Sequence, residues 1–116
     1  MEFDILTIFP ESFESYFNTS LIKRAQQKKL IKIRIHNLRQ WTKNKHQTVD
    51  DRPYGGGPGM IFLLEPIYQA VKDLKKRKKF PSTDEKVILF SAKGKELTQQ
   101  KVEELAKKKR LILICP

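Results

Sequence analysis

The chain has 116 residues, a length that fits one domain with a single modest hydrophobic core. It carries 24 Lys and Arg against 13 Asp and Glu, a formal net charge of +11 that favours a polyanionic partner, nucleic acid first and an anionic membrane surface second. A lysine-rich surface can also serve solubility alone, so the charge leaves both explanations open.

No apolar run approaches the roughly 18 residues that a membrane span requires. The opening segment has acids in place of the basic lead of a signal peptide. The chain has a single cysteine, Cys115, which excludes an internal disulfide. It has only two histidines in total, so no metal site is expected. We therefore expect a cytoplasmic protein with no membrane partner and no metal.

The sequence opens with an apolar, β-prone segment at 1–9, which predicts a buried strand that Pro10 ends. Ser12 can then cap a short helix over 13–17. A second helix is expected over about 21–29, with lysines at its carboxyl end, where they complement the helix dipole.

Residues 31–36 alternate apolar and basic side chains, a pattern typical of a strand with one face in solvent. This pattern places His36 on the solvated face. The polar segment that follows is centred on Trp41, which we expect to be a packing anchor rather than a platform for stacked bases.

The second half of the chain alternates helices and apolar strands. Glu65 and Pro66 mark a helix start, because a proline in the first turn lacks only an N–H that would be unpaired there anyway. Residues 87–90 form a continuous apolar run, which predicts a buried parallel strand. Thr98 can cap another helix, and 111–115 predict the last strand.

This order of elements predicts an α/β fold with a mostly parallel sheet and helices on both faces. Ligands of such sheets bind outside the carboxyl ends of the strands. The loop at 91–95 and the residue after Cys115 both fall at that edge.

The segment HQTVDDRPYGGGPGM at 46–60 holds four of the five glycines and two prolines. Its glycines should prevent a helix or a strand, because glycine loses the most backbone entropy on ordering. Its prolines stiffen it, and we expect Tyr54 and Met60 to pin its ends. The segment therefore predicts a shaped loop with a bare backbone, suited to close approach by a flat or polyanionic ligand.

The glycine segment does not match the known phosphate-binding motifs. No Gly-Lys-Ser/Thr follows, and the glycine spacing differs from GxGxxG. Asp50 and Asp51 are neighbours and should point apart, which makes a poor pair of catalytic carboxylates; one of them can instead accept hydrogen bonds from backbone amides of the loop. From the residues alone, the reaction stays open.

The same fifteen residues resemble the hallmark of the bacterial tRNA (guanine-N1)-methyltransferases. The resemblance extends over the entire chain, through FDILTIFPESF at 3–13, SLIKRA at 20–25, VILFSAKGK at 87–95 and LILIC at 111–115. It implies a SPOUT-type domain of the trefoil-knot class and S-adenosylmethionine as the methyl donor. It also implies methylation of guanosine N1 next to the anticodon, an obligate homodimer, and the anticodon arm of tRNA as a partner.

The resemblance also implies which residues bind the ligands. The positions that match the cofactor pocket are Leu89, Phe90, Ser91, Gly94 and Pro116. Pro58 and Gly59 match positions that press against the target guanine. His46, Asp50 and Tyr54 match positions that shape the loop or meet the anticodon arm.

The chain departs from the family pattern at three places. Ala92 and Lys93 replace Pro-Gln in the cofactor loop, and Pro116 stands where a glycine is usual. Residues 1–116 also match only the N-terminal part of the SPOUT-type domain, before the knot would be completed. The catalytic aspartate and the C-terminal helical tRNA-binding domain are expected beyond Pro116, so residues 1–116 alone are expected to be inactive. A non-catalytic basic RNA-binding remnant is the alternative, and a basic domain with a purely structural glycine loop is a third reading.

Overall fold

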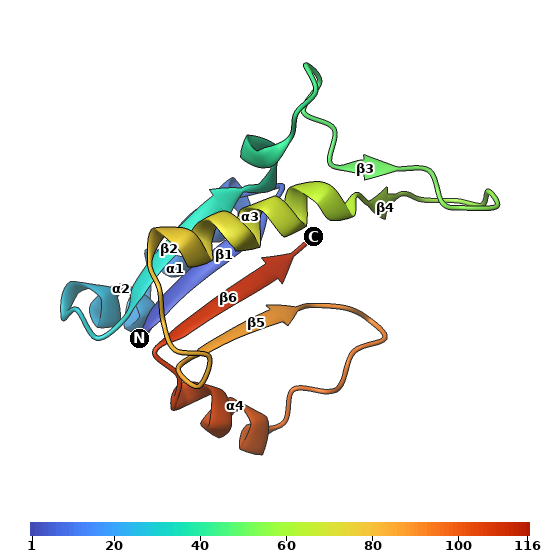
Figure 1. Ribbon diagram of the computed structural model, residues 1–116. Helices are drawn as coiled ribbons and strands as arrows, with labels where there is room; N and C mark the ends of the chain where they lie inside the picture. The colour runs from blue at the N-terminus through green and yellow to red at the C-terminus, as the bar shows by residue number, and fades with distance from the viewer.

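Four parallel strands form the central sheet of the computed structural model, which describes residues 1–116 (Figure 1). They are β1 (Glu2–Thr7), β2 (Lys32–Asn37), β5 (Glu85–Leu89) and β6 (Arg110–Cys115). Their order is β2-β1-β6-β5, and every pairing is parallel. The first and last strands of the chain therefore lie side by side in the middle of the sheet.

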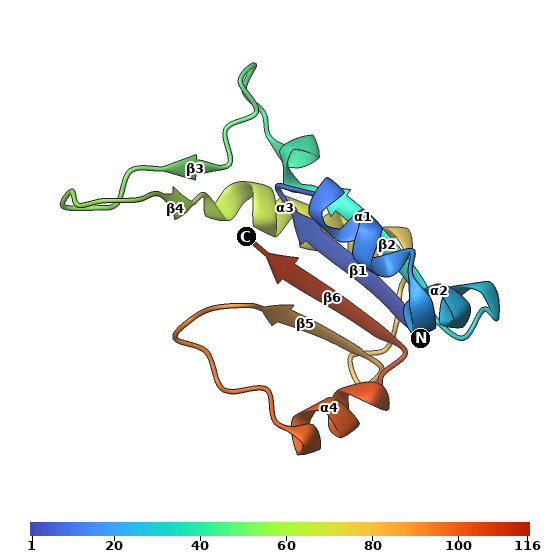
Figure 2. The same cartoon turned by 180° about the vertical axis from the view of Figure 1, so that it is seen from behind.

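Helices cover both faces of this sheet, as Figure 2 shows from behind. The helix α3 (Leu64–Arg77) lies on one face, while α1 (Glu11–Phe17), α2 (Ser20–Gln27) and α4 (Gln99–Ala106) lie on the other. The predicted α/β architecture with a mostly parallel sheet and helices on both faces is thus confirmed. None of the helices combines the length and the apolar character that crossing a bilayer would require.

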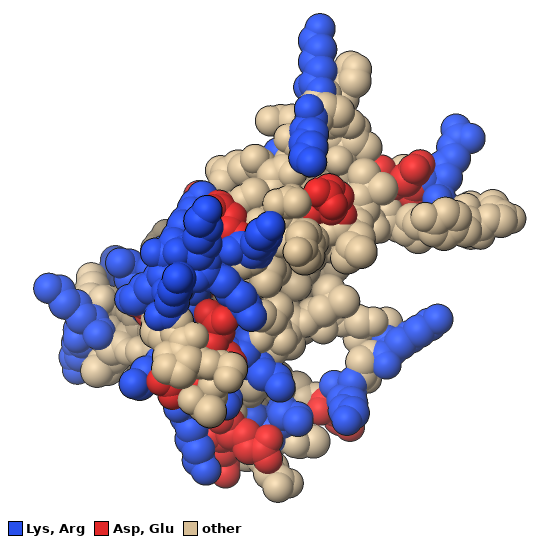
Figure 3. Space-filling model, viewed as in Figure 1, with Lys and Arg blue, Asp and Glu red and all other residues tan.

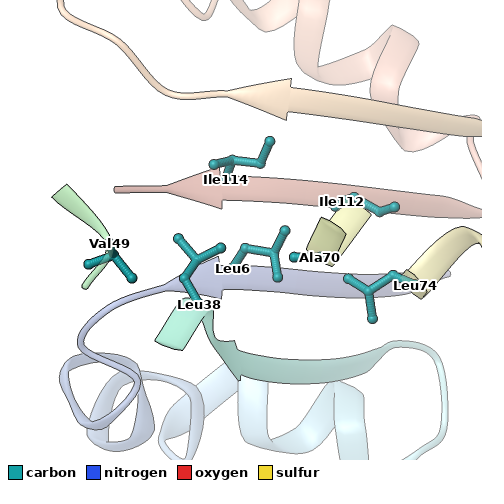
Figure 4. Packing of buried hydrophobic residues seen from close by; sticks show 7 residues of the cluster. All are labelled: Leu6, Leu38, Val49, Ala70, Leu74, Ile112 and Ile114. Atoms are coloured by element: carbon teal, nitrogen blue, oxygen red, sulfur yellow. The ribbon is translucent and has the colours of Figure 1, made fainter. Parts of the chain in front are cut away.

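The hydrophobic core lies between α3 and the sheet (Figure 4). It contains alternate residues of β1 and β6 and the inner face of α3, because side chains repeat every second residue in a strand and every third or fourth in a helix. Each fully buried Leu or Ile contributes about 1.5–3 kcal/mol relative to exposure. The buried members of the cluster are Leu6, Leu38, Val49, Ala70, Leu74, Ile112 and Ile114.

A short 3₁₀ helix, η1 (Leu38–Trp41), follows β2 and was not predicted. Asn37 begins it by accepting a 3.0 Å hydrogen bond from the backbone N–H of Arg39. Trp41 packs against the core and donates a 3.0 Å hydrogen bond from Nε1 to Oδ2 of Asp73 on α3. Trp41 is therefore a packing anchor, as predicted.

Several predicted element boundaries were wrong by one or two residues. Helix α1 begins at Glu11 after Pro10, so Ser12 lies inside the helix rather than capping it. Strand β5 begins at Glu85 rather than 87. Thr98 does cap α4, accepting a 3.2 Å hydrogen bond from the N–H of Lys101.

The prediction that His36 faces solvent was also wrong. Its side chain is only 14% exposed, and Nε2 lies 2.8 Å from Oδ1 of Asp4 on the neighbouring strand. Arg34, on the same face of β2, donates 2.8 Å and 3.1 Å hydrogen bonds to the two oxygens of Asp4. Arg34 and His36 are therefore directed at a buried carboxylate, while Lys32 at the start of β2 is exposed.

Asp4 is the centre of this buried ion cluster. Burial alone would raise its pKa, but hydrogen bonds from His36, Arg34 and Arg110, with the charge of Arg110, outweigh burial and hold the pKa well below its usual range. Arg110 is itself buried and also donates to the carbonyl oxygens of Leu74 and Lys78 at 3.1 Å and 2.9 Å. These two bonds fix the carboxyl end of α3 to the sheet, and the bond to Lys78 satisfies a carbonyl just beyond the end of the helix.

Candidate functional site

The glycine segment forms a two-stranded arm that projects from the body of the molecule (Figure 1). Strand β3 (Asp50–Asp51) pairs antiparallel with β4 (Ile61–Phe62), and the N–H of Leu63 donates a 2.8 Å hydrogen bond to the carbonyl of Val49. The prediction that no part of 46–60 forms a strand is therefore wrong at Asp50 and Asp51. The glycines themselves lie in the connecting loop, as expected.

The arm is attached to the core by a residue other than those predicted to pin it. Val49 is 2% exposed and belongs to the core cluster. Tyr54 is 96% exposed and Met60 is 56% exposed, so neither packs on the body, and the prediction that they pin the loop was wrong. Both side chains are instead free to contact a ligand from outside.

The loop of the arm is shaped by its own backbone. The N–H of Gly56 donates a 3.1 Å hydrogen bond to the carbonyl of Pro53. Oδ1 of Asp51 accepts a 2.7 Å hydrogen bond from the N–H of Arg52, so one of the paired acids does bind a loop amide. Gly55, Gly56 and Gly57 have φ of 79°, 84° and 107°.

These positive φ values explain why glycine is needed at the tip. They lie in the left-handed region, which a side chain makes costly by about 1–2 kcal/mol per residue. A Cβ added at Gly55, Gly56, Gly57 or Gly59 would meet no atom within 4 Å. The glycines therefore serve backbone conformation rather than packing within the chain, and the space beside each of their Cα atoms is open.

The residues expected to bind the substrate all lie along this arm. His46 is exposed at its base, in a turn where the N–H of Thr48 donates a 2.8 Å hydrogen bond to Oδ1 of Asn44. Asp50 is half-buried and opposite Phe62. The exposed positions Tyr54, Pro58 and Gly59 lie in the loop between the two strands.

A second candidate site lies between β5, α4 and the loop that joins them. It is a cavity of about 560 Å³, and 12 of its 18 lining residues are hydrophobic. Four of the five positions matched to the cofactor pocket line it, namely Leu89, Phe90, Ser91 and Gly94. The fifth, Pro116, does not line the cavity and lies just after the carboxyl end of β6.

The loop over this cavity is held by a tight turn. The N–H of Gly94 donates a 3.0 Å hydrogen bond to the carbonyl of Ser91, and the N–H of Lys93 donates to Oγ of Ser91 at 3.2 Å. A Cβ at Gly94 would lie 3.1 Å from the Ser91 carbonyl oxygen, which is closer than a side chain normally tolerates. The turn therefore favours glycine at position 94, because any side chain would displace the Ser91 carbonyl by a few tenths of an ångström.

Sequence reasoning missed the opposite wall of the cavity. Leu97, Val102 and Leu105 line it, and Glu96 is the single acid among the lining residues. The only signal in the sequence was the apolar face of α4. Lys93 is exposed and does not line the cavity, whereas Lys95 does.

Comparison with known proteins gives the chain a family. Residues 1–116 match the family model described as tRNA (Guanine-1)-methyltransferase TrmD. The chain is 50% identical over 115 residues to a tRNA (guanine-N(1)-)-methyltransferase of Dictyoglomus turgidum, covering 99% of this chain and 44% of that protein. It is 44% identical over 115 residues to the protein of the same name from Bacillus cereus, covering 99% of this chain and 46% of that one.

The fold agrees with a solved structure in the same group. The crystal structure of tRNA (m1G37) methyltransferase from Aquifex aeolicus matches with a TM-score of 0.85 and 35% identity, over 99% of this chain and 50% of that chain. The predicted SPOUT-like fold class is thereby confirmed. The chain spans about half the length of the relatives it matches. Because the family match covers all 116 residues, the chain belongs to the tRNA (guanine-1)-methyltransferase family.

Proposed function

We propose that this chain supplies the guanine-binding arm and part of the cofactor pocket of an enzyme that methylates N1 of the guanosine next to the anticodon of tRNA. S-adenosylmethionine is the proposed methyl donor. The observation that carries this proposal is the projecting arm, whose tip has four glycines of positive φ and no packing partner within the chain. An arm with this geometry is suited to a ligand that comes from outside.

The proposed role of the arm is to hold a purine that has left its stack. A base buried in a folded RNA must be extruded before its N1 atom can be reached. The bare backbone around Gly59 lets a flat ring approach closely, and Pro58 adds a rigid apolar surface. Tyr54, which is almost fully exposed, is available to stack on a neighbouring base.

The cavity under the 91–97 loop suits the adenosine part of the proposed cofactor. Its walls are mainly apolar, and the turn at Ser91 and Gly94 presents backbone groups at its rim. When bound, S-adenosylmethionine would supply an electrophilic methyl group. Leu89 and Phe90 would cover the adenine. The lining carries three lysines against one acid, Glu96, so the cavity offers no net attraction for the positively charged end of the cofactor.

Positioning is the main contribution that these residues would make. In a displacement on an activated methyl group, holding the reacting atoms in line supplies much of the rate. A proton acceptor for guanine N1 is also required. We assign no residue of 1–116 to that role. A homodimer that binds the anticodon arm and works in the cytoplasm remains part of the proposal.

The deciding experiment is methyl transfer to an anticodon-arm RNA from labelled S-adenosylmethionine. An enzyme that contains residues 1–116 together with the catalytic residues expected beyond Pro116 should label RNA that carries guanosine after the anticodon and leave RNA with adenosine there unlabelled. Residues 1–116 alone should label neither RNA. Gly59→Ala should lower kcat/KM at least about tenfold, because a side chain strains the backbone at a φ of 89° and intrudes on the purine. Lys45→Ala, at the exposed base of the arm, serves as the control.

Two outcomes would contradict the proposal. Equal labelling of the guanosine and adenosine RNAs would remove the assigned substrate. Tight RNA binding with no methyl transfer, when the residues expected beyond Pro116 are present, would favour the alternative of a non-catalytic RNA-binding remnant.

A further inference from the structure

A second surface of the chain is marked by an uninterrupted stripe of lysines on the outer face of α3. Lys72, Lys75 and Lys76 are exposed, and Lys79 continues the stripe beyond the end of the helix. The opposite side of α3 is buried through Pro66, Ala70 and Leu74. Figure 3 shows basic side chains gathered over the carboxyl-terminal half of this helix. We call these four lysines the α3 stripe.

Most of the charge on this stripe is not neutralised within the chain. No carboxylate lies within 4.0 Å of the amino groups of Lys72, Lys76 or Lys79, whereas Nζ of Lys75 lies 3.4 Å from Oε1 of Glu85. The nearest acid on the helix, Asp73, is already paired with Arg77 at 2.7 Å. Three uncompensated positive charges therefore lie along one face.

Stabilisation of the helix dipole accounts for only part of this pattern. Lysines in the last turn complement the negative end of a helix, which covers Lys75 and Lys76. It does not cover Lys72, which lies a turn earlier, or Lys79, which lies beyond the helix. Lys72 instead lies over Tyr68, with Nζ 5.9 Å from the ring centroid, and that ring is 54% exposed.

The stripe is joined directly to the glycine arm. Strand β4 ends at Phe62, and α3 begins two residues later at Leu64. A helix of 14 residues is about 21 Å long, so the outer face of α3 leads from the base of the arm to the far end of the sheet. An RNA strand whose base enters the arm can therefore continue along this helix.

We propose that the α3 stripe is a phosphate-binding track for the RNA backbone next to the base that the arm holds. Lys72, Lys76 and Lys79 contact phosphates, and Tyr68 marks the end of the track nearest the arm. This inference rests on the function proposed above. The Cβ atoms of lysines one helical turn apart are about 5–6 Å from each other, a spacing that suits a line of phosphates. Insertion into an anionic membrane would also require apolar side chains among the lysines.

The test compares two triple variants that remove the same charge. Lys72→Gln/Lys76→Gln/Lys79→Gln changes the stripe. Lys23→Gln/Lys28→Gln/Lys107→Gln changes exposed lysines on α2 and at the end of α4, which lie on the other face of the sheet and make no ion pair. The affinity of the protein for a fluorescent anticodon-arm RNA is measured at several salt concentrations.

The stripe variant should reduce the slope of log K against log salt by about 2 to 3, since each lost phosphate contact removes about 0.7–0.9. Its affinity at low salt should fall at least about tenfold, while the control variant stays within about twofold of the original protein. Equal losses in the two variants would show only a general effect of net charge and would overturn the inference. No RNA binding by the unchanged protein would overturn it as well.

Two further measurements separate this inference from the proposed function. Replacing the target guanosine with adenosine tests the arm. Equal methylation of the two RNAs would contradict the proposed function, but it would leave the ratio of RNA affinities between the two triple variants unchanged. Vesicles containing phosphatidylserine test the membrane alternative. If the stripe variant loses vesicle binding but keeps RNA binding, the track serves a membrane and the inference is wrong.

Discussion

Nε of Arg110 donates a 2.8 Å hydrogen bond to Oδ2 of Asp4, although the two residues are 106 positions apart in the chain. The bond joins the two central strands of the sheet, and both side chains are almost completely buried. Arg110 also holds the carboxyl end of α3 through two backbone carbonyls. The α3 stripe and the base of the arm are therefore both positioned by a helix that this ion pair fixes to the sheet.

Asp4→Asn should destabilise the fold by about 3 kcal/mol at pH 7, because the buried Arg110 loses its 2.8 Å partner and keeps only the 3.2 Å ion pair with Glu85. The folded-state pKa of Asp4 lies below its unfolded value near 4, so its contribution is present above about pH 4 and is lost as pH falls further. Urea unfolding at pH 7, 5 and 3 should show a smaller loss of stability on acidification in the variant. If the variant loses as much stability between pH 7 and pH 3 as the original protein, other carboxylates dominate the pH dependence of stability.

Val49→Ala should loosen the arm. Val49 is the buried residue that connects the arm to the core, and removing two methyl groups there costs about 1.6 kcal/mol of burial. Hydrogen–deuterium exchange should increase over β3 and β4 more than over the central sheet. Ile61→Val, a smaller change on β4, serves as the control. Uniform faster exchange in all elements would indicate global destabilisation instead.

Tyr54→Ala should leave stability within about 0.5 kcal/mol of the original protein, because the ring contacts almost nothing in the chain. If the ring stacks on RNA, its removal should weaken binding of the anticodon arm by about 1–3 kcal/mol. Tyr16→Ala, which removes another exposed tyrosine on α1, is the matched control. Equal effects on affinity would exclude a specific role for Tyr54.

Gly94→Ala should weaken S-adenosylmethionine binding by at least about fivefold. The added Cβ would be 3.1 Å from the carbonyl oxygen of Ser91 and would push the turn at the rim of the cavity. Lys93→Ala alters the neighbouring position, which does not line the cavity, and should have little effect. Isothermal titration measures the affinity of each variant for S-adenosylmethionine. If Gly94→Ala and Lys93→Ala bind it equally well, the cofactor does not bind in this cavity.

The sequence predicted the four main strands well because each has an apolar run or a regular alternation that local pattern reveals. It failed at His36 because the pattern identifies a polar face but not what that face meets. Asp4 lies 32 positions earlier in the chain, and only the pairing of β1 with β2 brings the two residues together. A two-residue strand such as β3 has too few positions for any pattern, and its partner β4 depends on the closed loop between them.

The sequence likewise predicted some features of the candidate sites and missed others. Leu89, Phe90, Ser91 and Gly94 converge on one cavity because they belong to a single strand and the turn after it. The exposure of Tyr54 could not be inferred from local sequence, since it depends on the arm standing away from the body. The reaction itself came from the fifteen-residue resemblance, because nothing in the charge or spacing of the segment names a methyl group or a guanine.

The placement of β1 beside β6 also governs how the chain can fold. In synthesis, β1 is made first and can pair early only with β2, so its other edge stays open until residues 110–115 have left the ribosome. Pairing β1 with β6 closes a loop that contains almost the whole chain. Closing so long a loop delays the pairing of the central strands and raises the contact order of the domain. We expect slow folding with an intermediate that exposes the apolar edge of β1, and chaperone dependence should be greatest at that stage.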